Sequence, residues 1–554
     1  MVPRHAEKLA CDLITTQFGE LVGKVCNCLV YKGNLALHEI ARFTELTPAQ
    51  LKNCLLVLIQ HNCVQAYRVE AEEGLVAAKI FTQYSAIVNN ILHRMRFAKF
   101  LALTREHLGE ESESLLEGLL EHGRLTLEQL IQRAVAQSGK GESEIEGPLK
   151  ETFSGLVRSH FIERCPVPEP VLPLRSESAP KKVVRGSARS RKAVKDTEQE
   201  TEEQRIIAAA APLEGERFLL PSSVDHDMSI DKGNDDSIRS SKIGEKRKYE
   251  CLKEDAWMST VANEKEILWR ANYEEFVRRL RHKACASHVR ARLDLRAGTV
   301  LEAMLEATMI SESSAKPKIS APLSMSAIEQ AVLESKEGRI MTMDRIQACL
   351  DQMSSDSVGY LTRAREMDGQ YIINMHKILL DARKSEVEAI VRKRYGIESC
   401  RIFKLLAMKG QLEQKQISEQ ALVGRKETLE LLYKLFKDGY LQMQEIAKSQ
   451  DHAPSKTFYL WRVNYPNLME RIVDDMYHAA SNLGQRLAHE LEQEQEVIDL
   501  LKQMHQSKAT DGSTSQVTLT KSQREKKDKM RRIATILEAS LLKLDDSLML
   551  FHDF

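Results

Sequence analysis

The sequence lacks the cysteine pairs and long apolar runs that mark disulfide-rich and membrane-spanning proteins. Its 10 cysteines are scattered over 554 residues without a Cys-x-x-Cys pair, so we expect free thiols in a reducing compartment. Cys26 and Cys28 form an isolated Cys-x-Cys, which favours small apolar side chains on a helix over a zinc site. No apolar run approaches the roughly 20 residues that span a bilayer, and the first residues lack the pattern of a secretory leader. We therefore expect a soluble, intracellular protein without membrane contact.

An excess of one charge is absent as well. The 80 lysines and arginines balance 80 aspartates and glutamates, so the formal net charge is zero. Such a chain has no general attraction to nucleic acid or anionic membranes, and any attraction must come from local patches. The length predicts about three to five domains, because globular domains usually hold roughly 100 to 200 residues.

Catalytic signatures are missing too. No His-Glu-x-x-His, Gly-x-Ser-x-Gly or dinucleotide-binding fingerprint occurs. The adjacent Asp451 and His452 are a candidate for acid–base chemistry, but a catalytic base needs a third group and a pocket that orient it. Pro454 follows closely and fixes its own φ, so a turn is the favoured interpretation. We predict no catalytic residue, no cofactor and no metal ligand.

An internal repeat predicts the fold. Residues 32–64 align without a gap on residues 409–441, with glycines and apolar residues in matching places. The matched pairs are Gly33 and Gly410, Leu35 and Leu412, Ile40 and Ile417, Leu55 and Leu432, Leu58 and Leu435, and Val64 and Leu441. A further copy starts at Gly123, and a weaker one runs from Leu323 to Val358 without the glycine. Each copy predicts a leading helix, a turn, a helix-turn-helix and a hairpin, which together form a winged helix.

The remaining segments have other patterns. Residues 166–255 are rich in proline and charge, which predicts a disordered linker with one short helix near residues 202–210. Two apolar stripes after residue 465 predict an antiparallel coiled-coil hairpin, or two helices that fold onto the preceding domain. The predicted fold is mainly α with small β wings, with winged helices at 1–88, 89–165, 256–380 and 381–464, and the hairpin at 465–554.

Local basic clusters are the candidates for nucleic-acid contact. Residues 277–296 predict a helix whose apolar stripe, including Val277, Ala291 and Leu295, packs while basic side chains face outward. Its predicted phosphate contacts are Arg278, Arg279, Arg281, Lys283, Arg290 and Arg292. The last repeat adds Arg425, Lys426 and Lys434 on its third helix and Lys456 in its wing. A solvated face, or a surface that docks on an acidic protein, explains such clusters equally well.

Several stretches resemble one protein family. They are RIFKLL (401–406), LEQKQI (412–417), DHAPSKTFYLWRVN (451–464) and, more loosely, FGELVGKV near Phe18 and LVLIQHNCV near Leu56. The sequence resembles the third-largest subunit of eukaryotic RNA polymerase III, a relative of the large subunit of the general factor TFIIE.

The resemblance implies a non-catalytic nuclear subunit. Members of that family join two smaller subunits in a dissociable trimer and pack on the clamp of the largest subunit. They help initiation factors to recruit the enzyme and to open promoter DNA, double- or single-stranded, at tRNA, 5S rRNA and similar genes. Basic clusters at Lys181 to Lys195 and Lys246 to Lys248 are candidate nuclear import signals. The alternatives are a winged-helix DNA-binding transcription regulator and a scaffold of the proteasome-lid or initiation-factor type.

Overall fold

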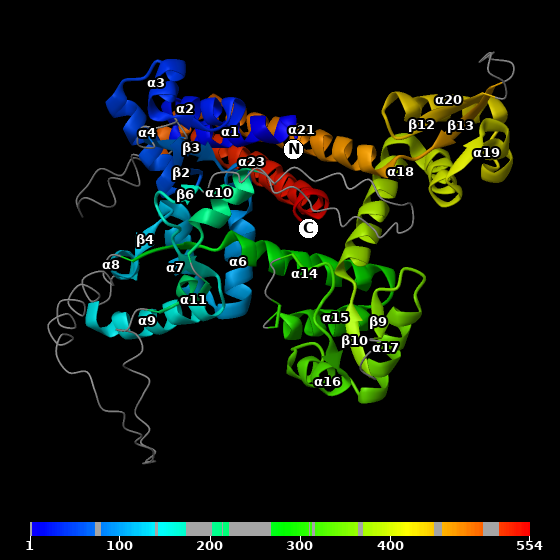
Figure 1. Cartoon of the computed structure of the whole chain (residues 1–554), viewed down its shortest axis with the longest axis horizontal. Helices are drawn as coiled ribbons and strands as arrows, with labels where there is room; N and C mark the ends of the chain where they lie inside the picture. Colours follow the sequence, from blue (N-terminus) through cyan, green and yellow to red (C-terminus); the bar gives the residue numbers. More distant parts are fainter. Residues whose placement is uncertain are drawn as a thin grey trace, which may run out of the picture. The chain divides into compact units, whose positions relative to one another are not determined.

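Two compact units make up the chain, one of Glu7–Phe276 and one of Val277–Phe554 with the residues up to Ala6. The computed structural model describes residues 3–71, 79–138, 142–172, 202–212, 214–220, 267–309, 311–312, 316–363, 369–447, 457–501 and 520–554. Figure 1 shows mainly helices with small sheets, as the sequence predicts. Each unit is described by itself.

The first winged helix lies in the unit Glu7–Phe276. Its elements are α1 (Arg4–Phe18), α2 (Glu20–Lys32), β1 (Leu35–Ala36), α3 (Leu37–Thr44), α4 (Pro48–Gln60), β2 (Val64–Ala71) and β3 (Lys79–Ala86). Gly33 ends α2 at a φ of 82°, a left-handed conformation that favours glycine. Thr47 and Gln50 form a capping box that starts α4, with Pro48 in its first turn. Ile40, Leu55 and Leu58 are buried, as the repeat predicts.

The second winged helix completes its sheet with a strand from far along the chain. Its elements are α5 (Val88–His93), η1 (Arg94–Arg96), α6 (Phe97–Leu108), α7 (Glu110–His122), β4 (Leu125–Thr126), α8 (Leu127–Ser138), α9 (Glu142–Arg158), β5 (Ile162–Arg164) and β7 (Leu268–Ala271). Strand β7 lies between β4 and β5 and pairs antiparallel with both. Trp269 of β7 is 0% exposed and meets the Phe153 ring edge-on. The predicted boundary at residue 256 is therefore wrong, because residues 268–271 belong to the second domain.

Parts of the predicted disordered linker are also folded. Strand β6 (Val171–Leu172) pairs parallel with β2, and α10 (Glu202–Ala210) and α11 (Glu214–Arg217) follow. Helix α10 matches the predicted short helix, and its Ile206 is 1% exposed. The prediction of disorder is wrong for these described residues, because apolar side chains here find a sheet to pack against. The candidate import signals at Lys181 to Lys195 and Lys246 to Lys248 lie outside the described residues.

The third winged helix is the weak fourth copy of the repeat. It follows α14 (Tyr273–Arg292) and has the elements α15 (Leu295–Thr308), β8 (Leu323–Ser324), α16 (Met325–Glu334), α17 (Met343–Ser355), β9 (Leu361–Arg363) and β10 (Gln370–Ile373). Its sheet has the order β8-β10-β9. Ile328, Leu350 and Met353 are 0% exposed and belong to one apolar core. These residues lie within the segment from Leu323 to Val358 in which the sequence predicts this copy, so the winged-helix prediction is confirmed.

The last winged helix has the elements α18 (Met375–Lys409), β11 (Gln411–Glu413), α19 (Gln414–Ala421), α20 (Arg425–Lys437), β12 (Gln442–Ala447) and β13 (Thr457–Arg462). Gly410 ends α18 at a φ of 85°, which matches Gly33 of the first repeat. The sheet has the order β11-β13-β12, and Met443 lies opposite Trp461. The hairpin that the sequence predicts for this copy of the repeat is thus present as β12 and β13. Asp451, His452 and Lys456 lie outside the described residues.

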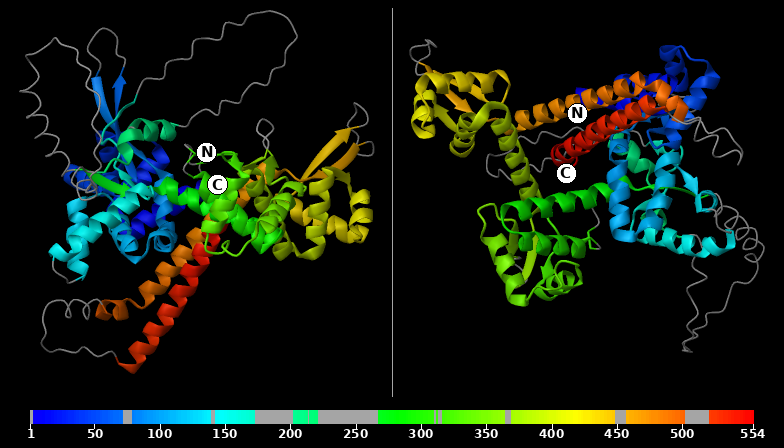
Figure 2. Two further views of the ribbon diagram at one scale, coloured as in Figure 1. Left: turned by 90° about the horizontal axis from the view of Figure 1, so that it is seen from below. Right: turned by 180° about the vertical axis from the view of Figure 1, so that it is seen from behind.

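The chain ends in a helical hairpin of α21 (Tyr465–Gln493), α23 (Lys521–Leu548) and a final turn, η3 (Met549–Asp553). Figures 1 and 2 show α21 and α23 side by side. They run antiparallel, because Tyr477 meets the ring of His552 while Glu494 pairs with Lys526. The final turn also packs on the third winged helix, where Phe554 contacts the apolar core. Both predicted arrangements of these helices are therefore partly correct.

Candidate nucleic-acid and protein interfaces

Two of the predicted phosphate contacts on α14 are buried and bonded within the chain. Arg278 is 7% exposed, and its Nη2 donates to the carbonyl oxygen of Met309 at 2.6 Å. Arg281 is 3% exposed, and its Nη2 donates to the carbonyl oxygen of Pro317 at 2.8 Å. These guanidinium groups tie α14 to the segment after α15. Because they do not reach the surface, the prediction that they contact phosphates is wrong.

The face on which α14 packs also differs from the predicted stripe. Val277 is buried, but Leu295 is 61% exposed and Ala291 is exposed, while Cys285 and Val289 are buried instead. The helix stops at Arg292, and the side chain of Asp294 accepts a hydrogen bond from the amide of Leu295 to start α15. The structure therefore has a break where the sequence predicts one continuous helix over residues 277–296. The aliphatic parts of the arginine side chains fill part of the buried face.

Arg290 and Arg292 neutralise carboxylates of the same unit. Arg290 pairs with Glu302 at 2.7 Å and Glu337 at 3.3 Å. Arg292 pairs with Asp381 at 2.7 Å. Because their charge is already balanced, phosphate contact would require these pairs to break. Arg279 is half-buried and Lys283 is exposed, so Lys283 is the best placed of the six to reach solvent.

Asp381 of α18 is the centre of a polar network. Its Oδ2 accepts hydrogen bonds from Nε2 of His288 at 2.8 Å and from the hydroxyl of Tyr360 at 2.9 Å. Burial raises the pKa of Asp381. The two hydrogen bonds and the charge of Arg292 together lower it by more than burial raises it, so the pKa lies below the ordinary value. The network joins α14, the third wing and α18, and its role is structural.

His282 is expected to make the stability of this unit depend on pH. Burial, followed by the charges of Arg278, Arg281 and Arg279, lowers the pKa of His282 to about 3. The unfolded chain therefore takes up a proton that the folded chain does not, and stability present above pH 6.5 is lost as pH falls toward 3. Between pH 7 and pH 5 the His282→Gln variant should lose about 2 kcal/mol less unfolding free energy than the parent. Denaturant unfolding at both pH values measures this, and equal losses would contradict it.

The basic residues of the last winged helix are differently placed. Arg425, Lys426 and Lys434 of α20 are exposed, and within the described residues none of them forms an ion pair. Lys437 is exposed on the same helix. Arg462, by contrast, is half-buried, and its Nη2 donates to Oε1 of Gln442 at 3.3 Å. The basic surface that remains open to a partner is therefore on α20 rather than on most of α14.

Helix α20 also carries exposed apolar side chains that sequence reasoning missed. Leu429 is 37%, Tyr433 is 52% and Phe436 is 41% exposed. The sequence signal was their i, i+4, i+7 spacing, but this spacing is shared by core-facing residues and does not separate the two cases. Only the positions of Thr428, Leu432 and Leu435, which are buried, reveal which stripe faces the core.

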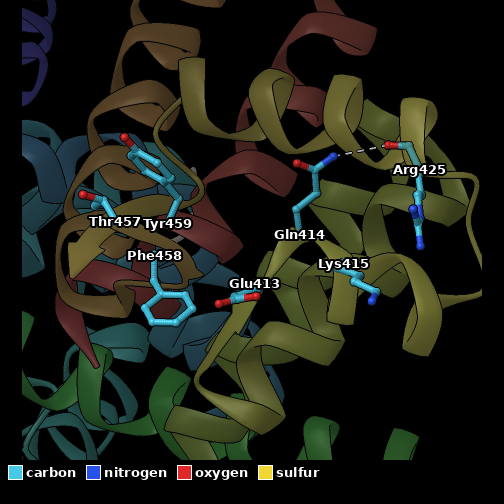
Figure 3. Close-up of a pocket in the computed structure, with 7 residues that line it drawn as sticks. All are labelled: Glu413, Gln414, Lys415, Arg425, Thr457, Phe458 and Tyr459. Carbon is cyan, nitrogen blue, oxygen red and sulfur yellow. Dashed lines mark hydrogen bonds between the residues drawn. The ribbon is translucent and has the colours of Figure 1, made fainter. Parts of the chain in front are cut away.

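A hollow of about 360 Å³ lies where α19, α20 and β13 meet. Figure 3 shows its lining, in which Phe458 and Tyr459 of β13 point to different sides and Arg425 lies at the start of α20. Gln414 donates from Nε2 to the carbonyl oxygen of Arg425 at 3.4 Å. The complete lining is Glu413, Gln414, Lys415, Arg425, Thr457, Phe458 and Tyr459. The lining thus holds two aromatic and two cationic side chains together with the carboxylate of Glu413.

Metal-ion clusters and membrane-spanning helices are absent from the described residues. Across these residues, no three His, Cys, Asp or Glu side chains come together in a way that could hold a metal ion. None of the described helices combines the length and apolar character needed to cross a membrane.

Family models match most of this architecture. The model described as RNA polymerase III subunit RPC82 helix-turn-helix domain matches residues 8–69. The model described as RNA polymerase III subunit RPC82 matches residues 151–381, and POLR3C, C-terminal winged-helix domain, matches residues 387–463.

Curated relatives match along the whole length. The proteins named DNA-directed RNA polymerase III subunit RPC3 from Homo sapiens and Danio rerio are both 26% identical, over 99% and 98% of this chain and 97% and 96% of their own length. The relative of that name from Dictyostelium discoideum is 24% identical over 99% of this chain and 100% of its own length. Since relatives and models agree along the winged helices, the chain belongs to the RPC3 (RPC82) family of RNA polymerase III subunits.

Proposed function

We propose that the chain is a non-catalytic subunit of nuclear RNA polymerase III that assists initiation-factor recruitment and promoter opening at tRNA, 5S rRNA and other small RNA genes. The observation that carries the proposal is the end-to-end match to relatives named as subunits of that enzyme. The described surface supports a contact role, since it offers winged helices and a basic helix face. In this proposal polymerisation belongs to the two largest subunits.

The proposed partners are of two kinds. The protein partners are two smaller subunits of a dissociable trimer, the clamp of the largest subunit, and initiation factors. The nucleic-acid partner is promoter DNA, as duplex or melted strand, met by Lys283 of α14 and by Arg425, Lys426 and Lys434 of α20. These residues are chosen because they are exposed, whereas Arg278 and Arg281 are buried.

Two templates test the proposed role. RNA polymerase III is purified with and without this chain and is given either a tRNA gene with initiation factors or a duplex with a single-stranded tail. Without the chain, transcription from the gene should fall by at least tenfold, while the tailed template should be transcribed at a rate within about twofold of the complete enzyme. An equal loss on both templates would place the chain in RNA synthesis. If the chain does not co-purify with the enzyme, the regulator alternative replaces the proposal.

The DNA contact on α20 predicts a change in salt dependence. Each phosphate contact contributes about 0.9 to the slope of log affinity against log salt for duplex DNA. The triple variant Arg425→Ala, Lys426→Ala, Lys434→Ala should therefore lower this slope by about 2 to 3. Fluorescence anisotropy with a labelled duplex measures the slope between 50 and 200 mM salt, a range over which three phosphate contacts account for a loss of about 40-fold in affinity.

A matched control removes the same charge elsewhere. Lys8, Lys24 and Lys52 are exposed residues of the first winged helix. Their combined change to alanine should leave the slope within about 0.5 of the parent, because none is proposed to meet a phosphate. If the control variant lowers the salt slope as much as the α20 variant does, the change is caused by net charge. The proposed contact between α20 and DNA would then be wrong.

A further inference from the structure

The first three turns of α23 carry a high density of positive charge. From Lys521 to Arg532, seven of the twelve residues are basic and two, Glu525 and Asp528, are acidic. Five of the basic side chains are exposed and form no ion pair with a residue that the structure describes. These five are Lys521, Arg524, Lys529, Arg531 and Arg532. Their charge is therefore available to a partner.

The five side chains lie on the side of α23 that faces away from α21. At 100° per residue they fall within an arc of about 160°, centred almost opposite the apolar stripe of the helix. That stripe runs from Ile533 to Leu548 and packs on α21, which lies beside α23 in Figure 2. Lys526 is on the stripe side, where it meets Glu494 of α21 at 3.8 Å. The outward charge is therefore not used to hold the two helices together.

The acidic side chains of the hairpin do not cancel the outward charge. On the outward face itself, five cations stand against two acids, which leaves an excess of three positive charges. On α21, Glu490 pairs with Arg486 and Glu494 pairs with Lys526. Further exposed acids of α21 and the residues directly after it are Glu492, Glu496 and Asp499. Exposed acids thus gather on one helix and exposed cations on the other, so a polyanion is directed to α23.

The chemistry of the outward face favours phosphates over a protein surface. Among the exposed residues from Lys521 to Arg532 none is apolar, and the next exposed apolar residue along the helix is Ile536. Protein contacts generally bury an apolar core, whereas phosphate contacts need only positive charge. Lys521 and Arg532 are about 16 Å apart along the helix axis, a length over which duplex DNA presents about ten phosphates.

We propose that the outward face of α23 from Lys521 to Arg532 binds the phosphate backbone of nucleic acid in the assembled polymerase, without reading base sequence. Contacts from Lys and Arg to phosphates position a nucleic acid but carry no sequence information. The face shares no residue with the proposed DNA contacts on α20 and at Lys283, so it is an additional surface. The inference rests on the proposed function for the assembly, in which both DNA and RNA are sources of phosphate.

The salt dependence of duplex binding tests the face in the full chain. The chain first receives the three α20 substitutions, so that α20 contributes nothing. Changing Arg524, Arg531 and Arg532 to alanine should then lower the slope of log affinity against log salt by about 2 to 3, equally for two unrelated sequences. The matched control changes Arg392, Lys393 and Lys409 of α18 to alanine; these residues are exposed and carry the same total charge. An unchanged slope for the α23 variant, or an equal change for the control, would overturn the proposal.

Photocrosslinking in the assembled enzyme identifies the source of the phosphates. A benzophenone amino acid replaces Thr535, which is exposed one turn after Arg531, and the polymerase is irradiated while it transcribes a tRNA gene with labelled DNA or labelled RNA. A crosslink to DNA or to RNA supports the proposal and names the source, whereas crosslinks to protein alone would overturn it. The same probe at Met408, which is 77% exposed on α18, should give no nucleic-acid product, and an equal yield there would also overturn it. A chain that is missing from the purified enzyme would contradict the proposed function, and the salt slope of the free chain would still decide whether α23 binds phosphates.

Discussion

The Trp269→Ala variant is expected to lose about 3 to 5 kcal/mol of unfolding free energy, the range found when a large aromatic side chain is removed from a core. Trp269 is 0% exposed, and its ring meets Phe153 with centroids 5.1 Å apart. Its strand supplies the middle of the β4-β7-β5 sheet. Truncation therefore leaves a cavity and weakens the packing of β7, which joins the sheet from far along the sequence.

Denaturant unfolding, followed by circular dichroism, measures the loss. Leu268 is the matched control, because it is the neighbouring residue of β7 and is 39% exposed. Leu268→Ala should cost less than about 1 kcal/mol, since little buried area is lost. Equal losses for the two variants would mean that β7 does not complete the core of the second winged helix.

The Asp381→Asn variant is expected to lose about 2 to 3 kcal/mol of unfolding free energy at pH 7. The carboxylate accepts charge-assisted hydrogen bonds from His288 and Arg292 as well as one from Tyr360, and hydrogen bonds to a charged group contribute about 1.5 to 3 kcal/mol. Because its pKa is lowered in the folded chain, the stabilisation is present above the ordinary value of 3.8 and is lost as pH falls through the folded pKa. The difference in unfolding free energy between parent and variant should therefore become smaller below pH 4.

Asp351 supplies the control for this prediction. It pairs with Arg363 at 2.9 Å, but the two side chains are 52% and 63% exposed. Exposed pairs contribute little, so Asp351→Asn should change the unfolding free energy by no more than about 0.5 kcal/mol. A loss for Asp351→Asn as large as that for Asp381→Asn would show that general charge, rather than the network, sets the stability.

The repeated winged helix could be predicted from the sequence because its signals are local. Gly33 and Gly410 adopt the same left-handed turn, and the apolar spacing that follows each is fixed by the helix period. The strand at 268–271 could not be assigned in this way. Its partner strands, β4 and β5, lie before the long linker in the sequence. The residues of so short a strand do not determine which strands of a sheet it will pair with.

The packing of the basic helix could not be predicted from the sequence for a related reason. Sequence periodicity treats every arginine as exposed, yet Arg278 and Arg281 bury their stems and bond to carbonyl oxygens that only the folded chain brings near. The basic residues of α20 are exposed, as a contact surface requires, but the apolar stripe beside them could not be recognised from the sequence. Core-facing and partner-facing stripes have the same spacing, and burial is needed to tell them apart.

We propose that this chain helps RNA polymerase III to open promoter DNA. The reactivity of unpaired thymines toward permanganate around the start site of a tRNA gene tests this, with polymerase that contains or lacks the chain and a full set of initiation factors. Without the chain, we predict that reactivity on closed duplex falls to background, while a template melted in advance restores initiation. Full reactivity on closed duplex in the absence of the chain would contradict the claim.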